Sequence, residues 1–201
     1  MGVKLALAKP PDPAPLHERA DEDLMTLVRA GVAPALRVLA DRYMQNLVRF
    51  CGKLVVDAAI GQEIAQQAWL QVWAHRASYQ SKDRFRVFLF TVARNLCRNE
   101  LRRRARLGTW IDTRAPEERV AKVAEDAPEA LDALLLRERR RELLSALGAV
   151  PEPQREALLL RFDEELDYED MAAVLGESPS TLRSRVYYGL RALREAMPRD
   201  S

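Results

Sequence analysis

The stretch 84–106 gathers positive charge along one side of a predicted helix. It holds eight arginines and a single acid, Glu100, which gives a local net charge of +7. The arginines spaced by four residues, with the amides beside them, are Arg94, Asn95, Arg98, Asn99 and Arg102. A helix would carry these arginines on one face. Arginine binds phosphates and amide side chains can bond base edges, so this surface predicts nucleic-acid binding. The alternative is a solvated charged face, but such faces usually mix the two signs.

Three aromatic residues lie near cations at the start of the same stretch. They are Tyr79, Phe85 and Phe88, and the cations include Lys82 and Arg86. Unstacked bases stack on aromatic rings close to positive charge. Phe85 and Phe88 also fit the apolar face of the helix, which favours a place in the core. We therefore expect Tyr79 to be the exposed ring, in a loop that could hold an extruded base.

A second basic surface follows a helix-turn-helix pattern near the end of the chain. The first helix is predicted over 168–175, capped by Asp167, and the second over 179–197, capped by Ser178. Leu182 and Val186 would pack inward. The outward side chains in the first half of the second helix are Ser180, Thr181, Arg183, Ser184 and Arg185. In this motif that half of the second helix reaches base edges in duplex DNA. The alternative is a generic helical hairpin.

An acidic stretch lies just before and within the first of these two helices. Positions 163–170 hold six acids in eight residues. DNA would repel this edge, so it must face solvent or a protein.

The elements that position these surfaces are predicted to be helices. Glycine is scarce, at 8 of 201 residues, and alanine, leucine and arginine dominate. Apolar residues recur at helical spacing in eight segments. The predicted helices are about 22–30, 34–54, 60–75, 86–106, 131–147, 154–162, 168–175 and 179–197. The fold class is therefore all-α.

The helices group into two small domains joined by a flexible linker. Residues 1–20 contain four closely spaced prolines and are predicted to be an extended leader. The first domain is predicted over 21–107 and the second over 131–201. Between them, 108–130 loses the apolar spacing and is predicted to be the linker.

Several functional classes are disfavoured by composition. The chain has 32 basic and 30 acidic residues, so it is not a uniformly basic histone-like protein. It has no catalytic or phosphate-loop motif and too few histidines and cysteines for a zinc site. We expect no cofactor, no metal and no enzymatic activity. No apolar run could insert in a membrane, and the two cysteines fit a reducing, cytoplasmic location.

The two surfaces, in this order, resemble the sigma-70 family of bacterial RNA polymerase sigma factors, in its extracytoplasmic-function (ECF) group. The segments 63–73, 85–96, 150–161 and 167–185 resemble the family's core-binding, promoter-melting and duplex-binding regions. The resemblance implies that the partners are core RNA polymerase and promoter DNA. It also implies a core-binding surface at Glu63, Gln66, Gln67 and Leu70. The family usually has an acid where Gln67 stands.

The same resemblance assigns the two basic surfaces to the two promoter elements. The residues implied to bind the melted minus-ten strand are Tyr79, Lys82, Arg86, Arg94, Asn95, Arg98, Asn99 and Arg102. Those implied to bind the minus-thirty-five duplex are the outward residues of the last helix, from Ser180 to Arg185. The linker would also leave room for an anti-sigma factor between the domains, as in many members of the family.

Two other classes stay open at this point. One is a helix-turn-helix regulator that binds duplex DNA without polymerase, and the other is a helical adaptor that binds no nucleic acid. The arginine-rich stretch 84–106 speaks against a sensor domain in the first class. The five arginines against one acid over 183–199 speak against the second.

Overall fold

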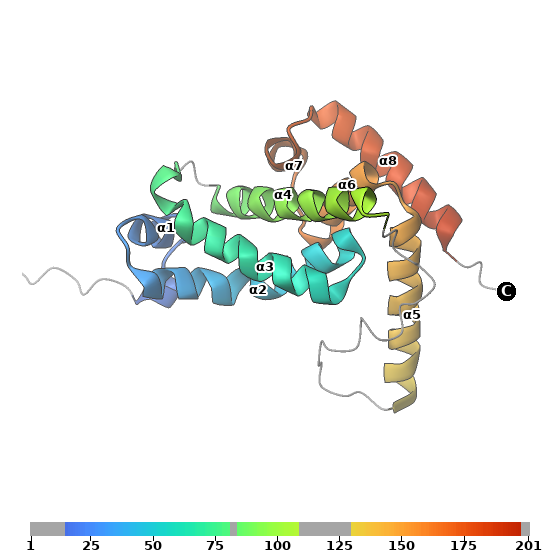
Figure 1. Cartoon of the computed structure of the whole chain (residues 1–201), viewed down its shortest axis with the longest axis horizontal. Helices are drawn as coiled ribbons and strands as arrows, with labels where there is room; N and C mark the ends of the chain where they lie inside the picture. Colours follow the sequence, from blue (N-terminus) through green and yellow to red (C-terminus); the bar gives the residue numbers. More distant parts are fainter. Residues whose placement is uncertain (1–14, 81–83, 109–129, 198–201) are drawn as a thin grey trace, which may run out of the picture.

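The computed structural model describes residues 15–80, 84–108 and 130–197, and its elements are helical throughout these ranges (Figure 1). A first module contains four α-helices. They are α1 (Asp21–Arg29), α2 (Ala33–Val55), α3 (Ala58–Ala74) and α4 (Phe85–Arg106), with short 3-10 turns η1 (Leu16–Glu18) and η2 (Arg76–Ser78). A second module contains α5 (Ala130–Ala149), α6 (Glu152–Leu158), a π-helical turn η3 (Leu159–Asp163), α7 (Tyr168–Leu175) and α8 (Pro179–Ala196). The predicted all-α fold of two small helical domains is confirmed. The predicted proline-rich leader falls mostly, and the linker almost wholly, outside the described residues.

A tight crossing of α2 and α3 organises the first module. A Cβ atom on Gly61 would lie 2.4 Å from the Cα atom of Gly52, so only glycine lets these backbones approach this closely. Asp57 lies at the corner between the helices and caps α3 by accepting a hydrogen bond from the Ile60 N–H at 3.2 Å. Helix α4 packs across this pair, with the rings of Phe50 and Phe90 in edge-to-face contact at 5.2 Å.

The start of α1 differs from what residue type alone predicts. Aspartate is a favoured capping residue, but the helix begins at Asp21 and Ala20 is the capping position. The Asp21 carboxylate instead pairs with Arg42 at 2.5 Å and accepts a hydrogen bond from the Tyr43 hydroxyl. These contacts tie α1 to α2.

The second module is built around α8. Gly189 lets this helix approach α6, since a Cβ atom there would lie 3.0 Å from Leu158. Arg155 is buried, and its guanidinium donates to the carbonyls of Leu147 and Gly148 at 3.0 and 3.3 Å, which satisfies the end of α5. The predicted caps Asp167 and Ser178 are confirmed, and each accepts a hydrogen bond from the third residue of its helix.

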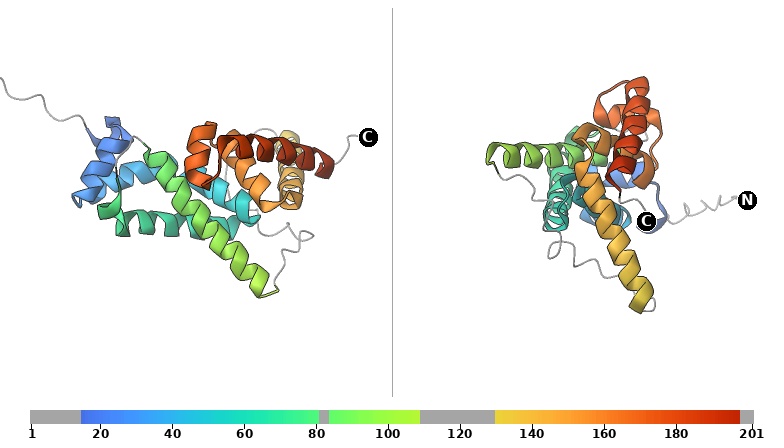
Figure 2. Two further views of the ribbon diagram at one scale, coloured as in Figure 1. Left: turned by 90° about the horizontal axis from the view of Figure 1, so that it is seen from above. Right: turned by 90° about the vertical axis from the view of Figure 1, so that its right-hand side faces the viewer.

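The two modules pack against each other. Helix α4 contacts α7, and α2 contacts both α6 and η3. In Figure 2, the second module lies along one side of α4 and α2. The buried apolar side chains of the two modules belong to one connected cluster. Over the described residues, no helix combines the length and the apolar character needed to span a membrane.

Candidate nucleic-acid interface

Helix α4 exposes a row of polar and basic side chains. Asn95, Asn99 and Arg102 are exposed there, whereas Arg86 and Arg98 are half-buried. Arg103 and Arg106 add two more exposed guanidinium groups toward the end of the helix. Donors with one sign of charge therefore line this face, an arrangement suited to a phosphate backbone.

The sequence predicted that Arg94 lies on the outward polar face of the helix, and this prediction is wrong. Arg94 is 9% exposed and forms a two-pronged ion pair with Glu156 of α6. The Arg94 Nε and Nη2 atoms lie 3.1 and 3.3 Å from the two carboxylate oxygens. Burial raises the pKa of the Glu156 carboxyl, and hydrogen bonds and charge from Arg94 act against that rise. The sequence pattern missed this burial because the partner lies in the other module.

Half of the acidic stretch faces the first module, and its other three acids, Glu165, Asp167 and Glu169, are exposed. Asp163 pairs with Lys53 at 2.7 Å, and Asp170 approaches Arg84 at 3.8 Å. Glu164 is 1% exposed and forms an ion pair with Arg86 at 3.5 Å, while its backbone carbonyl accepts a hydrogen bond from the same guanidinium. The edge was predicted to face solvent or a protein; three of its acids are exposed, and the other three pair with cations of the chain's own first module.

Tyr79 was predicted to be an exposed ring, and this prediction is wrong. It is 5% exposed and its ring lies edge-on to Phe85 and Phe88, with centroids 6.3 and 5.0 Å apart. Its hydroxyl donates to Glu22 of α1 at 2.7 Å. Phe85 is in the core, as expected, and Phe88 is partly buried against it. Lys82 lies outside the described residues.

A shallow hollow remains beside the buried Tyr79. The side chains that line it come from η2, the residues after it and the start of α4: Ser78, Tyr79, Gln80, Arg84, Val87 and Phe88. It offers hydroxyl, amide and guanidinium donors around an apolar floor. An unstacked base requires this combination of polar edge partners and apolar contact.

Helix α8 presents the predicted outward residues. Ser180, Thr181, Arg183 and Ser184 are exposed, and Leu182 and Val186 are buried as predicted. Arg185 is half-buried, because Glu177 holds its guanidinium at 2.8 Å and leaves the side chain 23% exposed. Arg183 lies over the ring of Tyr168, with 5.0 Å from the guanidinium carbon to the ring centroid. The hydroxyls of Ser180 and Thr181 each lie 2.9 Å from that of Ser178, and the Ser184 hydroxyl donates to the Ser180 carbonyl at 3.3 Å.

A third surface runs along α3. Glu63, Gln66, Gln67 and Leu70 are all exposed, and Leu70 is 70% exposed, which is unusual for a leucine. Trp69 is buried and Trp73 is half-buried beneath Arg76, so both rings contribute to packing.

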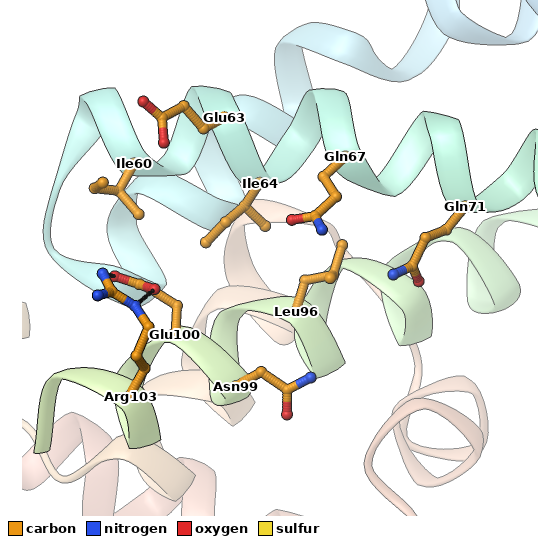
Figure 3. Close-up of a pocket in the computed structure, with 9 residues that line it drawn as sticks. All are labelled: Ile60, Glu63, Ile64, Gln67, Gln71, Leu96, Asn99, Glu100 and Arg103. Atoms are coloured by element: carbon orange, nitrogen blue, oxygen red, sulfur yellow. Dashed lines mark hydrogen bonds and ion pairs between the residues drawn. The ribbon is translucent and has the colours of Figure 1, made fainter. Parts of the chain in front are cut away.

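A groove separates this part of α3 from α4 (Figure 3). Gln67 and Gln71 point from α3 toward α4. On the α4 side, Arg103 donates two hydrogen bonds of 2.8 Å to Glu100. The residues of this groove that sequence reasoning left out as site residues are Ile60, Ile64, Gln71, Leu96, Glu100 and Arg103. Their spacing follows the facing sides of two helices, a signal that is visible only once the helices are paired.

Comparisons with known proteins match both modules of the chain. The family model for sigma-70 region 2 matches residues 39–107, and that for sigma-70 region 4 matches residues 140–193. The RNA polymerase sigma factor CarQ of Myxococcus xanthus is 31% identical over 173 residues, covering 86% of this chain and 95% of CarQ. The ECF RNA polymerase sigma factor SigL of Mycobacterium tuberculosis is 30% identical and covers 82% of this chain and 90% of SigL.

The chain belongs to the ECF group of the sigma-70 family. In this sigma factor, region 2 corresponds to most of α2, with α3 and α4, and region 4 to the second half of α5 with α6–α8. Two solved structures share its fold. CnrH, in complex with the cytosolic domain of CnrY, has a TM-score of 0.66 at 19% identity, covering 88% of this sigma factor and 96% of CnrH. RpoE of Bartonella quintana, in complex with the anti-sigma factor NepR, has a TM-score of 0.61 at 23% identity, covering 80% and 94%.

Proposed function

We propose that this sigma factor binds core RNA polymerase through α3 and directs it to promoters that α4 and α8 recognise. The observation that carries this proposal is the placement of three exposed surfaces on one chain. Two of them are lined by arginine, amide or hydroxyl donors, and the third is a mixed polar and apolar face on α3. Membership of the family, whose relatives are named RNA polymerase sigma factors, supports the same function. The work is binding rather than catalysis, and we place it in the cytoplasm, where core polymerase and promoters lie.

Each surface has a distinct role in this proposal. Asn95, Asn99 and Arg102 contact the melted minus-ten strand, together with Arg86, Arg94 and Arg98 when those guanidinium groups are free. The hollow at Ser78 and Gln80 accepts an extruded base, and Lys82 stays a proposed contact of the same strand. The donors at the start of α8 contact the minus-thirty-five duplex: Ser180, Thr181, Arg183, Ser184 and Arg185. Tyr79 supports the hollow from below rather than stacking in the open.

A transcription assay tests the function directly. Core polymerase with the full chain is expected to start transcripts at defined positions on linear genomic DNA, and core polymerase alone is not. Mapping those starts gives the promoter consensus. A helix-turn-helix regulator, the alternative, would bind duplex DNA but give no new start sites with core polymerase.

Two matched variants of α8 test the duplex-binding surface. A side chain at position 183 that bonds a base reads one base pair of the promoter. Arg183→Ala is therefore expected to weaken binding to the promoter duplex by about 1–3 kcal/mol and to relax the preference at that base pair. Arg191→Ala removes the same charge from the same helix, at an exposed site paired with Glu195 at 2.9 Å. Equal losses for the two variants would mean that α8 acts only as a positive surface. An anti-sigma factor stays a predicted partner, to be sought by co-purification with the full chain.

A further inference from the structure

Five basic residues of the first module face acidic residues of the second. The pairs are Lys53–Asp163, Arg84–Asp170, Arg86–Glu164, Arg94–Glu156 and Arg98–Glu152, with N–O distances from 2.7 to 3.8 Å. In every pair the cation comes from the first module and the anion from the second. Random surface contact would mix the two directions, so the two faces are complementary in charge.

The centre of this contact is buried. The side chains of Arg94 and Glu156 are 11% and 2% exposed, and Arg98 also approaches Glu156 at 3.9 Å. A charge in such a place is strongly destabilised when its partner is removed. The outer pairs are partly exposed, with the side chains of Asp163, Asp170 and Glu152 at 29%, 33% and 34%. The contact therefore has a dry centre and a charged rim.

The same guanidinium groups are the ones proposed to bind the promoter strand. Arg86, Arg94 and Arg98 each point at a carboxylate of the second module. A guanidinium that gives its donors to a carboxylate cannot give them to a phosphate at the same time. Asn95, Asn99 and Arg102 stay exposed, so the contact covers only part of α4.

We propose that the free chain holds itself closed: Glu152 and Glu156 of α6 and Glu164 after η3 occupy the phosphate-binding guanidinium groups of α4. Asp163 and Asp170 strengthen the contact by pairing with Lys53 and Arg84. This inference rests on the proposed function, and it adds a layer of regulation to the minus-ten surface. Single-stranded DNA must displace Glu152, Glu156 and Glu164 before it can reach Arg86, Arg94 and Arg98. Whatever separates the modules therefore releases this surface.

Reversing the charge of the partly exposed acids should open the chain. The variant combines Glu152→Lys, Asp163→Lys and Asp170→Lys, which turns three attractions at the rim into repulsions. The matched control combines Glu138→Lys, Glu165→Lys and Glu169→Lys, which changes net charge equally at exposed positions outside the five pairs. Neither set alters a residue assigned to DNA or polymerase binding. Circular dichroism checks that both variants remain helical.

Two measurements on the full chain report the outcome. Small-angle X-ray scattering is expected to show a larger radius of gyration for the rim variant than for the control or wild type. Fluorescence anisotropy with a labelled (dT)20 strand is expected to show about tenfold tighter binding than the control, as three exposed ion pairs would allow. Adding Lys53→Glu to the rim variant restores one pair with swapped charges, and should recover part of the closed state. In the wild type, added salt should expand the chain, because exposed pairs are screened.

Two results would overturn the proposal. One is an equal radius of gyration for the rim variant and the control, which would mean that the pairs do not hold the modules together. The other is an opened chain with unchanged (dT)20 affinity relative to the control, which would mean that the contact masks nothing. The transcription assay separates the closure proposal from the proposed function. If the rim variant opens and binds (dT)20 more tightly, yet the protein starts no transcripts with core polymerase, the closure proposal is supported and the proposed sigma activity is rejected.

Discussion

The Glu22 carboxylate accepts the backbone N–H of Phe85 at 2.6 Å, across 63 positions of sequence. Its other oxygen accepts the Tyr79 hydroxyl at 2.7 Å. Helix α4 has no side-chain cap of its own, because Arg84 occupies the capping position. A carboxylate from α1 therefore takes the place of a local cap and ties Tyr79 to the start of α4.

Replacing Glu22 should loosen the packing of Tyr79 and the start of α4. Glu22→Ala is expected to lower the free energy of unfolding by about 1–2 kcal/mol, the range for losing a helix cap. Urea denaturation followed by circular dichroism measures the change. Glu18→Ala removes an exposed acid from the neighbouring turn and serves as the control. A loss no larger than that of the control would show that Glu22 does not hold α4.

Gly61→Ala tests the crossing of α2 and α3. The added Cβ atom would meet the Gly52 backbone at 2.4 Å, so the helices must move apart. We expect a loss of about 1–3 kcal/mol or more, as for other overpacked sites. Gln62→Ala, at the next and exposed position of α3, should leave the denaturation midpoint almost unchanged. If the Gly61→Ala variant proves as stable as wild type, the close approach described here is contradicted.

The paired acid Glu100 gives the stability of the first module a pH dependence. Hydrogen bonds from Arg103, followed by those from Arg104, lower the pKa of Glu100 to about 2. A carboxyl whose pKa is lowered in the folded state stabilises it above the unfolded pKa of about 4.3, and this stabilisation is lost as the pH falls toward 2. The free energy of unfolding of wild type should therefore exceed that of Glu100→Gln by the largest amount above about pH 5, and this excess should shrink at lower pH.

Thermal unfolding of both proteins across that pH range measures the difference. Glu63→Gln removes the same charge from the same groove, so subtracting its profile isolates the effect of the arginine pairing. If the difference in unfolding temperature between wild type and Glu100→Gln stays constant from neutral pH down to the pKa of Glu100, the pairing contributes no pH-dependent stability.

The exposed face of α3 should be needed for binding to core polymerase. The double variant Gln66→Ala, Gln67→Ala is expected to bind core enzyme at least several-fold more weakly, because exposed amides at a desolvated interface lose their hydrogen bonds. Its denaturation curve should match wild type, since both side chains are exposed. Gln45→Ala, an exposed amide on α2, is the control. Pull-down of core polymerase measures the affinity, and equal capture of all three proteins would reject this surface.

Local patterns were sufficient to predict most of the helices. Apolar spacing located the eight helices to within a few residues, and the caps at Asp167 and Ser178 followed from residue type alone. The predicted helix over 154–162 instead begins at Glu152 and passes into a π-helical turn from Leu159. Where the pattern is local, the sequence carried the information.

The errors concern residues whose partners are distant in sequence. Arg94 belongs to a polar row by spacing, yet Glu156 buries it from the other module. Tyr79 follows a helix in a polar segment, yet Glu22 and two phenylalanines enclose it. Spacing along one helix says nothing about which other element covers a face. An arginine-rich helix and an acid-rich stretch in the same chain signal a contact between the modules, but Glu156, which buries Arg94, lies outside that stretch.

The guanidinium group of Arg183 has two alternative partners, the Tyr168 ring and the promoter DNA of the proposed function. In the structure this guanidinium lies over the Tyr168 ring, which Arg161 also approaches, at 5.3 Å. Leaving a ring near the surface costs about 0.5–1 kcal/mol. A loose electrostatic contact with a duplex recovers little more than that, whereas a two-pronged hydrogen bond to guanine recovers about 1–3 kcal/mol. In the proposed function the tyrosine therefore competes with DNA for this guanidinium: the ring retains the arginine at most sites and releases it where a base pair offers the two-pronged bond.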